Sequence, residues 1–292
     1  MYISVGHQAD EHLELLQQLL DQQAFKRSAS TNKQATEQHY GLPLSSILEQ
    51  GLQNSESNNV SPVIEIRPDT EREQRKGTPE VIFGETKEVA QIIETARRLL
   101  ASSGRAIISR VRLEVVEALR ETFQECTLRI REAARAVVIY RPGYERRNTG
   151  GHVGVISAGT SDIPVAEEAT LIAEEMGCRV TCIYDVGVAG LHRLMEPLRD
   201  LLSTEVDVII VAAGMDGALP SVVAGLVPVP VIGLPTSIGY GMGGKGVAAL
   251  LSMLQTCAPG LSVVNIDNGV GAGMTAALIA NRVAQAREHQ SS

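Results

Sequence analysis

The feature that most constrains the fold of this 292-residue chain is a regular alternation in its second half. Between residues 150 and 285, short apolar runs alternate with stretches in which apolar residues recur at helical spacing. This alternation is typical of βαβ units that build a parallel sheet. The expected strands are Val153–Ser157, Val180–Tyr184, Val206–Ala212, Pro230–Leu234 and Leu261–Ile266.

Composition agrees with a sheet of this kind. Hydrophobic residues make up 44% of the chain, but aromatic residues only 3%, and Trp is absent. The core must therefore consist of Val, Ile, Leu and Ala, as in buried parallel sheets. Few aromatic rings and a net charge of −8 also argue against binding of nucleic acid.

A smaller α/β unit precedes the alternating region. Its expected strands are Val81–Phe83, Arg105–Ser109 and Ala136–Tyr140, and its expected helices span 87–101 and 113–123. We therefore divide the chain into a polar, partly helical or disordered extension (1–60), a small N-terminal α/β domain (61–148), the parallel-sheet domain (149–285) and a tail (286–292).

Targeting and cysteine signals predict a cytoplasmic protein. There is no apolar stretch of 18 residues, and the first residues are neither basic nor apolar, so we expect no membrane contact. The four cysteines form no CxxC pair and are expected to be reduced. Cys126, Cys178 and Cys182 are expected to be packing residues.

Ligands of open parallel sheets bind beyond the carboxyl ends of the strands. The first such turn, Ser157–Pro164, is rich in hydroxyl groups, and Asp162 is a plausible N-cap of a helix that Pro164 opens. A turn of this kind is either a phosphate site or an ordinary capped loop, and the spacing alone favours neither.

Two further turns carry titratable residues. Asp185, Gly187 and His192 lie in the second turn, and His192 is either a site residue or an ordinary side chain in the first turn of a helix. In the third, Asp216 follows Gly214 after a buried strand. Its carboxyl group either transfers a proton or stabilises its own turn.

Two glycine motifs imitate nucleotide-binding signatures. Gly239–Lys245 has the spacing of a P-loop, but Gly246 stands where a Mg²⁺-binding Ser or Thr is needed. Gly271–Ala276 resembles a dinucleotide fingerprint, but it lies too close to the end of the sequence for a complete βαβ unit. We expect neither activity.

Residue patterns alone do not decide the roles of two other features. Cys257 is expected at the end of a helix that begins near Lys245, where the helix dipole disfavours a thiolate, so a structural thiol is the default. The basic cluster Arg141–Arg147 is either a solvated linker or a set of cations that reaches an anionic ligand.

Several motifs, in consistent order over residues 62–285, resemble the LarB family, whose C-terminal domain is similar to PurE, the aminoimidazole ribonucleotide carboxylase/mutase. The PurE-like motifs are Ser161–Val165, Ala213–Pro220 and Pro228–Pro235. The LarB-like motifs are Arg75–Gly84, Asn148–His152 and Thr256–Gly271. The resemblance implies a three-layer, PurE-like (flavodoxin- or Rossmann-like) parallel-sheet domain beside a smaller N-terminal α/β domain.

The resemblance also implies a reaction. LarB-like proteins carboxylate the pyridinium ring of nicotinic acid adenine dinucleotide with CO₂ or bicarbonate and hydrolyse its phosphoanhydride. The products are AMP and pyridinium-3,5-biscarboxylic acid mononucleotide, the first intermediate of the nickel-pincer nucleotide cofactor. By similarity, Cys257 adds to the ring as a nucleophile, and the positive charge of the pyridinium stabilises its thiolate.

Roles follow residue by residue from the motifs. The implied catalytic residues are Cys257, Asp216 and His192. The implied substrate-binding residues are Ser157, Thr160, Ser161, Asp162, Asp185, Gly187, Gly214, Asp267 and Asn268. Asp216 stands where the family commonly has Glu, so its carboxylate reaches one methylene less far.

The resemblance further implies Mg²⁺ at the substrate pyrophosphate, without naming its protein ligands, and a homo-oligomer, an octamer in PurE-like domains, that shares sites between subunits. Two alternatives remain: a PurE-type imidazole ribonucleotide carboxylase/mutase, and a non-catalytic nucleotide-binding scaffold. A reactive thiol at Cys257 distinguishes the LarB-type activity from both.

Overall fold

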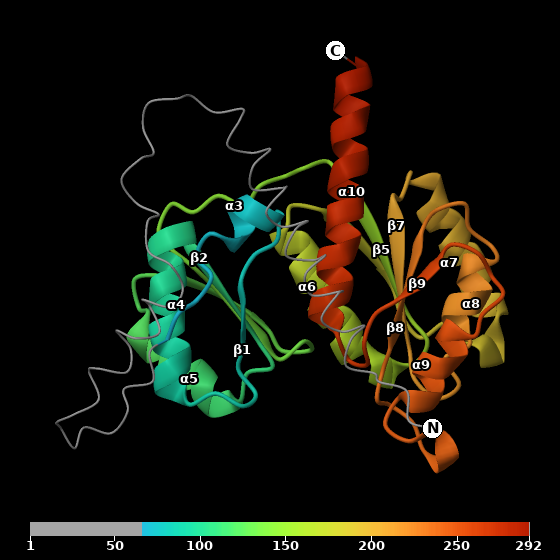
Figure 1. Cartoon of the computed structure of the whole chain (residues 1–292), viewed down its shortest axis with the longest axis horizontal. Helices are drawn as coiled ribbons and strands as arrows, with labels where there is room; N and C mark the ends of the chain where they lie inside the picture. Colours follow the sequence, from blue (N-terminus) through green and yellow to red (C-terminus); the bar gives the residue numbers. More distant parts are fainter. Residues whose placement is uncertain (1–65, 292) are drawn as a thin grey trace, which may run out of the picture. The chain divides into compact units, whose positions relative to one another are not determined.

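Two β-sheets form the framework of the computed structural model, which describes residues 66–291 (Figure 1). The extension expected over residues 1–60 lies outside the described residues. A parallel sheet carries the C-terminal half, and a mixed sheet carries the segment before it. The α/β class expected from the sequence is confirmed.

The parallel sheet has the strand order β6-β5-β7-β8-β9, and each neighbouring pair runs parallel. Its strands are β5 (His152–Ser157), β6 (Arg179–Ile183), β7 (Val208–Ala213), β8 (Val231–Pro235) and β9 (Leu261–Val263). All five expected strands are present. Strand β9 is shorter than expected, because its regular pairing with β8 ends at Val263, opposite Gly233.

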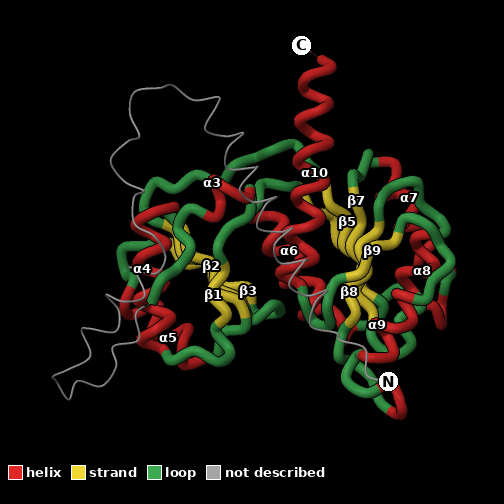
Figure 2. The backbone as a smooth tube through the Cα atoms, viewed as in Figure 1, coloured by secondary structure: helices red, strands yellow, loops and turns green. Residues whose placement is uncertain are grey.

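Helices cover both faces of the parallel sheet and make three layers (Figure 2). Helices α6 (Ile163–Glu175) and α10 (Gly269–Ser291) pack on one face. The other face carries α7 (His192–Ser203), α8 (Leu219–Ala224) and α9 (Val247–Leu254). Residues of β7 alternate between the two cores, with Ile210 in the first and Ile209 in the second. Helix α10 continues through residues 286–291, so the separate tail expected there is helical instead.

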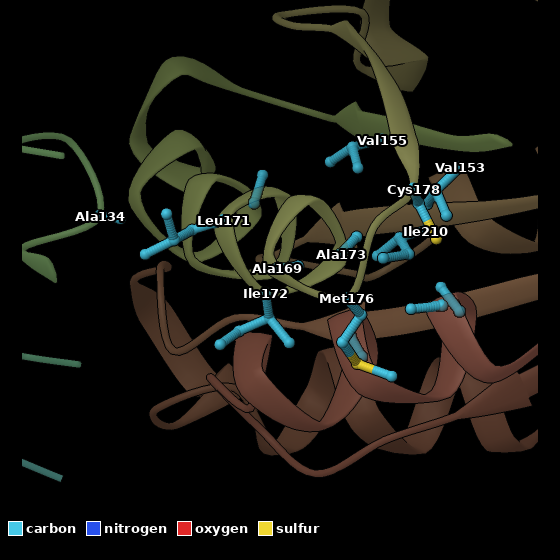
Figure 3. Close-up of a cluster of buried hydrophobic side chains, with 14 of the residues drawn as sticks. Ala134, Val153, Val155, Ala169, Leu171, Ile172, Ala173, Met176, Cys178 and Ile210 are labelled. Carbon is cyan, nitrogen blue, oxygen red and sulfur yellow. The ribbon is translucent and has the colours of Figure 1, made fainter. Parts of the chain in front are cut away.

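Small residues allow α10 to approach α6 closely. A Cβ atom at Gly273 would lie 2.5 Å from the Ala169 carbonyl oxygen, so only glycine fits there. Leu171 and Ile172 of α6 belong to the same buried cluster, together with Cys178 (Figure 3). The packing role expected for Cys178 is thereby confirmed.

The mixed sheet has the order β1-β2-β4-β3, with β1 and β2 parallel and the other pairs antiparallel. Its elements are α3 (Arg72–Lys76), β1 (Val81–Phe83), α4 (Val89–Ser103), β2 (Arg105–Ser109), α5 (Leu113–Thr122), β3 (Thr127–Arg131) and β4 (Ala136–Tyr140). Strand β3 is absent from the sequence expectations. Arg129 and Arg131 break the apolar pattern that would have predicted a strand here. In the structure they form ion pairs with Glu174 of α6.

Helix α6 lies between the two sheets. One face of the mixed sheet packs under α4 and α5, whereas Ile107 of β2 and Val138 of β4 join the core that contains α6. This arrangement explains why β2 and β4 are buried along their whole length. None of the helices in residues 66–291 combines the length and the apolar character that a membrane crossing requires.

Candidate functional site

The turn after β5 is anchored by a buried carboxylate. Asp162 accepts a hydrogen bond from the Gly159 amide at 2.9 Å and another from the Thr236 hydroxyl at 2.6 Å. Asp162 is the N-cap residue of α6, as expected, but its side chain makes no capping bond, since its oxygens accept from Gly159 and Thr236 rather than from the first amides of α6. Pro164 lies in the first turn of α6, as expected.

Burial shapes the electrostatics of this carboxylate. Removal from water raises the pKa of Asp162, and the negative charge of Asp267 raises it further. Hydrogen bonds from Thr236, Gly159 and Gly214 work in the opposite direction and favour the ionised form. Asp162 thus links the turns after β5, β7 and β8 at one edge of the sheet.

The turn after β7 approaches the loop after β8 very closely. A Cβ atom at Gly214 would lie 2.2 Å from the carbonyl oxygen of Ile238, which accepts a hydrogen bond from the Met215 amide at 2.8 Å. Gly214 therefore has a steric function. Asp216 is exposed, and its Oδ1 lies 3.4 Å from the Ala218 amide, the contact of an aspartate that stabilises its own turn.

The turn between β9 and α10 closes the same edge. Asp267 has a positive φ of 55°, its amide donates to the Pro235 carbonyl, and its carboxylate accepts from the Ser237 amide at 2.8 Å. Asn268 accepts from the Gly271 amide at 2.8 Å and caps the start of α10. Both residues therefore lie beside the end of β8.

The turn after β6 is the outer part of this edge. The Asp185 amide donates to the buried Ser157 hydroxyl at 3.3 Å, and the Asp185 carboxylate pairs with Arg193 at 3.1 Å. A Cβ atom at Gly187 would lie 2.9 Å from the Ala158 carbonyl oxygen. His192 is exposed in the first turn of α7, where the sequence placed it.

The hydroxyl residues differ in exposure. Ser157 is fully buried, whereas Thr160 and Ser161 are exposed on the single 3₁₀ turn Thr160–Asp162. The edge therefore combines exposed hydroxyls with the backbone amides of short glycine turns, groups that suit a phosphate-bearing ligand.

Cys257 does not lie at this edge in a single chain. Helix α9 ends at Leu254, so Cys257 belongs to the following loop rather than to the helix end. This loop leads into β9, whose first residue, Leu261, pairs with Val231, the first residue of β8. The exposed thiol is thus at the amino-terminal edge of the sheet. The five residues of β8 span about 16 Å between this edge and the carboxyl edge.

The other two cysteines differ from each other. Cys126 is half-buried and packs against the core of the mixed sheet. Cys182 is exposed on the edge strand β6, so the expectation that it is a packing residue is wrong for the single chain. Strand β6 has a neighbour on one side only, which leaves its outward residues uncovered.

The sequence patterns did not predict three residues of this region. Thr236 is a fully buried hydroxyl at the end of β8, a position that its place after an apolar run could have indicated. Arg110, at the end of β2, donates to the Asp267 carbonyl oxygen. The buried Glu168 accepts from Arg110 at 3.5 Å and lies beneath the turn that begins α10. No local pattern reveals contacts between residues so distant in sequence.

The described residues offer no ready-made metal centre. Nowhere in residues 66–291 do three or more His, Cys, Asp or Glu side chains gather closely enough to bind an ion. Asp162 and Asp267 come near each other, but backbone amides and the Thr236 hydroxyl already engage their carboxylates. The donor set therefore does not fit a resident Mg²⁺.

Two family models match the chain. Residues 152–291 match AIR carboxylase, and residues 63–141 match the LarB/PurE-like N-terminal domain. The chain is 44% identical over 220 residues to an uncharacterized protein of Methanocaldococcus jannaschii, covering 74% of this chain and 84% of that protein.

Shorter matches cover the parallel-sheet domain. The N5-carboxyaminoimidazole ribonucleotide mutase of the same organism is 35% identical over 127 residues, which are 43% of this chain and 74% of the mutase. The enzyme of that name from Thermotoga maritima is 33% identical over 134 residues, 44% of this chain and 73% of the enzyme. With its N-terminal domain, its three-layer sheet and these relatives, the chain belongs to the LarB family, a PurE-related group of the carboxylase/mutase type.

Proposed function

We propose that this chain carboxylates the pyridinium ring of nicotinic acid adenine dinucleotide and hydrolyses its phosphoanhydride, giving pyridinium-3,5-biscarboxylic acid mononucleotide and AMP. The observation that carries the proposal is the free, exposed thiol of Cys257 within a LarB-like motif. An imidazole ribonucleotide mutase has no use for such a thiol. The product is the first intermediate of nickel-pincer cofactor synthesis.

The proposed chemistry begins with the thiolate. Its sulfur adds to a ring carbon, and the ring electrons move onto the pyridinium nitrogen, which neutralises its charge. The resulting enamine carbon attacks CO₂ and forms the new carbon–carbon bond. A base then removes the proton from that carbon, and the C–S electrons leave with the sulfur, so that aromaticity returns. Asp216, exposed at the end of β7, is the proposed proton acceptor.

The edge around Asp162 supports binding of the rest of the substrate. Exposed hydroxyls of Thr160 and Ser161 are the proposed contacts for phosphate and ribose. Asp162 keeps this turn against β8 through Thr236, so we assign it a positioning role. His192 and Asp185 lie on the neighbouring turn and are proposed to contact the leaving nucleotide.

The proposed site needs more than one chain, because Cys257 and the Asp162 turn are at opposite edges of the sheet. We therefore propose that the thiol of one subunit completes the site of a neighbour in a homo-octamer. Helix α9 supports association, since Val247, Leu251 and Leu254 expose 50%, 58% and 61% of their surface in a line along it.

Mg²⁺ is proposed to arrive with the pyrophosphate of the substrate, as its counter-ion, rather than to occupy a protein site. This assignment agrees with the donor set of the described residues. No proposed step of the carboxylation depends on it.

The test is a turnover assay with nicotinic acid adenine dinucleotide, Mg²⁺ and ¹³C-bicarbonate, followed by mass spectrometry. We expect a labelled biscarboxylated mononucleotide and AMP from the wild type. Cys257→Ala should form no labelled product, whereas Cys182→Ala, which removes another exposed thiol, should remain active.

Other results would contradict the proposal in recognisable ways. AMP without label would indicate a pyrophosphatase and exclude the thiol chemistry. Turnover of carboxyaminoimidazole ribonucleotide instead would indicate a PurE-type mutase. Binding of the dinucleotide without turnover would indicate a scaffold.

A further inference from the structure

A cavity of about 290 Å³ lies where the mixed sheet meets α10, and we call it the junction cavity. Its charged lining residues are Glu73, Lys76, Arg105, Arg147, Glu175 and Arg282. They come from α3, the start of β2, the segment between the sheets, the end of α6 and the middle of α10 (Figure 1). The cavity is therefore built by segments far apart in sequence.

The junction cavity is separate from the candidate site. Thr149, which precedes β5, and Met176, which precedes β6, both line it. It thus lies at the amino-terminal edge of the parallel sheet, whereas Asp162 and its partners lie at the carboxyl edge. The cavity also belongs to the α6–α10 face, and the loop with Cys257 follows α9 on the other face.

Arg105 is held rigidly at the cavity with one donor unused. Its side chain is 4% exposed, its Nη2 donates to Glu73 at 2.8 Å, and its Nη1 lies 3.3 Å from the Glu175 carboxylate. Its Nε is the one buried side-chain nitrogen or oxygen without a hydrogen-bond partner within residues 66–291. A buried donor without a partner costs free energy, so the ion pairs with Glu73 and Glu175 must hold this guanidinium in the cavity wall.

Three more cations reach the cavity without a counter-charge. Lys76, Arg147 and Arg282 are exposed, and none forms a hydrogen bond or ion pair with another described side chain. Together with Arg105 they are four cations against two carboxylates, Glu73 and Glu175. The excess of two positive charges matches one phosphate dianion.

We propose that the junction cavity binds a small phosphorylated molecule, such as a sugar phosphate. The phosphate would lie between Arg147 and Arg282, beside the guanidinium of Arg105 in the cavity wall, and the exposed Gln285 amide at the rim suits a sugar hydroxyl. The volume is at the lower end for ligand pockets, so a dinucleotide is too large for it. The proposal does not depend on the reaction assigned to the other edge.

A bound phosphate would connect two separate parts of the molecule. Arg147 lies in the segment between the two sheets, and Arg282 lies on α10, so one bound phosphate would connect them. Since α10 begins at the turn of Asp267 and Asn268, the ligand would tighten a helix that starts in the candidate site.

The test uses the full chain, with isothermal titration calorimetry and hydrogen–deuterium exchange. Ribose 5-phosphate and inorganic phosphate are the probes, and ribose is the uncharged control. We expect binding of both phosphates but not of ribose, with slower exchange in residues 105–109 and 278–285. The variant Arg147→Ala/Arg282→Ala should bind at least about ten-fold more weakly.

A matched variant, Arg97→Ala/Arg199→Ala, removes two exposed arginines elsewhere and should bind like the wild type. The melting temperature of each variant without ligand checks its folding. Equal affinity of the Arg147/Arg282 variant, protection confined to residues 157–162 and 213–217, or no binding at millimolar ribose 5-phosphate would each overturn the proposal.

Discussion

At the scale of single residues, the candidate site depends on close backbone approach. Gly214 leaves no room for a side chain between the turn after β7 and the Ile238 carbonyl oxygen, which would lie 2.2 Å from an added Cβ atom. The Thr236 hydroxyl, which bonds Asp162, would lie 2.7 Å from the same Cβ. One added methyl group would therefore disturb two turns of the site.

Gly214→Ala should lower the free energy of unfolding by about 1–3 kcal/mol, because the backbone around Ile238 must move to avoid the new methyl group. Urea unfolding followed by circular dichroism measures it. Gly225→Ala is the control, since the nearest atoms to its Cβ would be 3.6 Å away. Equal losses in the two variants would show that the close contact at Gly214 is unimportant.

His152 gives the stability a pH dependence. It is buried at the start of β5, and burial, followed by the positive charge of Arg179, lowers its pKa below 6.5. The folded chain therefore binds the proton less well than the unfolded chain. The stability from neutral His152 is complete above pH 6.5 and is lost as the pH falls toward the lowered folded pKa.

His152→Gln should accordingly flatten the decrease in unfolding free energy between about pH 7 and pH 5, by up to about 1.4 kcal/mol per pH unit. Urea titrations at a series of pH values measure this slope. The exposed His289→Gln serves as the comparison and should keep the wild-type slope. A parallel shift of the whole curve in His152→Gln, without a change of slope, would contradict the assignment.

At the scale of elements, β2 supports the turn that starts α10. Arg110 follows β2, adopts a positive φ of 54°, and its guanidinium lies 4.6 Å from the centre of the Phe83 ring. From there it reaches Glu168 of α6 and the carbonyl oxygen of Asp267. Through Arg110 the mixed sheet thus contacts the turn that starts α10.

Arg110→Ala should make amide exchange about ten-fold faster in residues 265–272, because the turn loses one charged hydrogen bond of roughly 1.5 kcal/mol. Hydrogen–deuterium exchange with mass spectrometry measures it. Arg112→Ala removes bonds to the Glu85 and Lys87 carbonyls but touches no part of that turn, so exchange there should stay unchanged. Similar exchange rates in both variants would show that Arg110 does not stabilise this turn.

At the scale of the whole molecule, the residues of the proposed reaction lie at two opposite edges of the parallel sheet. The Asp162 turn is at the carboxyl edge, and the exposed Cys257 thiol is at the amino edge. Side-chain movement cannot cover the length of β8, so one chain cannot use both groups on one substrate. A second subunit can supply the thiol if the oligomer places opposite edges together.

Mixed oligomers test this arrangement. Cys257→Ala and Asp162→Ala should each be inactive alone, whereas a co-expressed mixture should regain about a quarter of the wild-type activity, since a site then combines two intact groups by chance. The ¹³C-bicarbonate product assay measures it, with chromatography to check that both variants form the wild-type oligomer. Mixtures that stay inactive would place both groups in the site of one chain.

Local sequence determined most of the elements. Apolar periodicity and turn residues located all five strands of the parallel sheet, and the start of α6 near Pro164, because these signals lie within a few neighbouring residues. Strand β3 was missed because Arg129 and Arg131 give this half-exposed edge strand a polar sequence, and the ion pairs that these arginines form with Glu174 cannot be seen locally.

Which of these residues meet depends on the tertiary structure. Asp162 and Thr236 are 74 positions apart, and Arg110 and Asp267 are 157 apart, so their contacts follow from the strand order and from α6 lying between the sheets. It also separated Cys257 from the turns with which the motif groups it. Periodicity records which face a residue presents, but not which distant segment packs there, because that choice is made by the packing of whole elements.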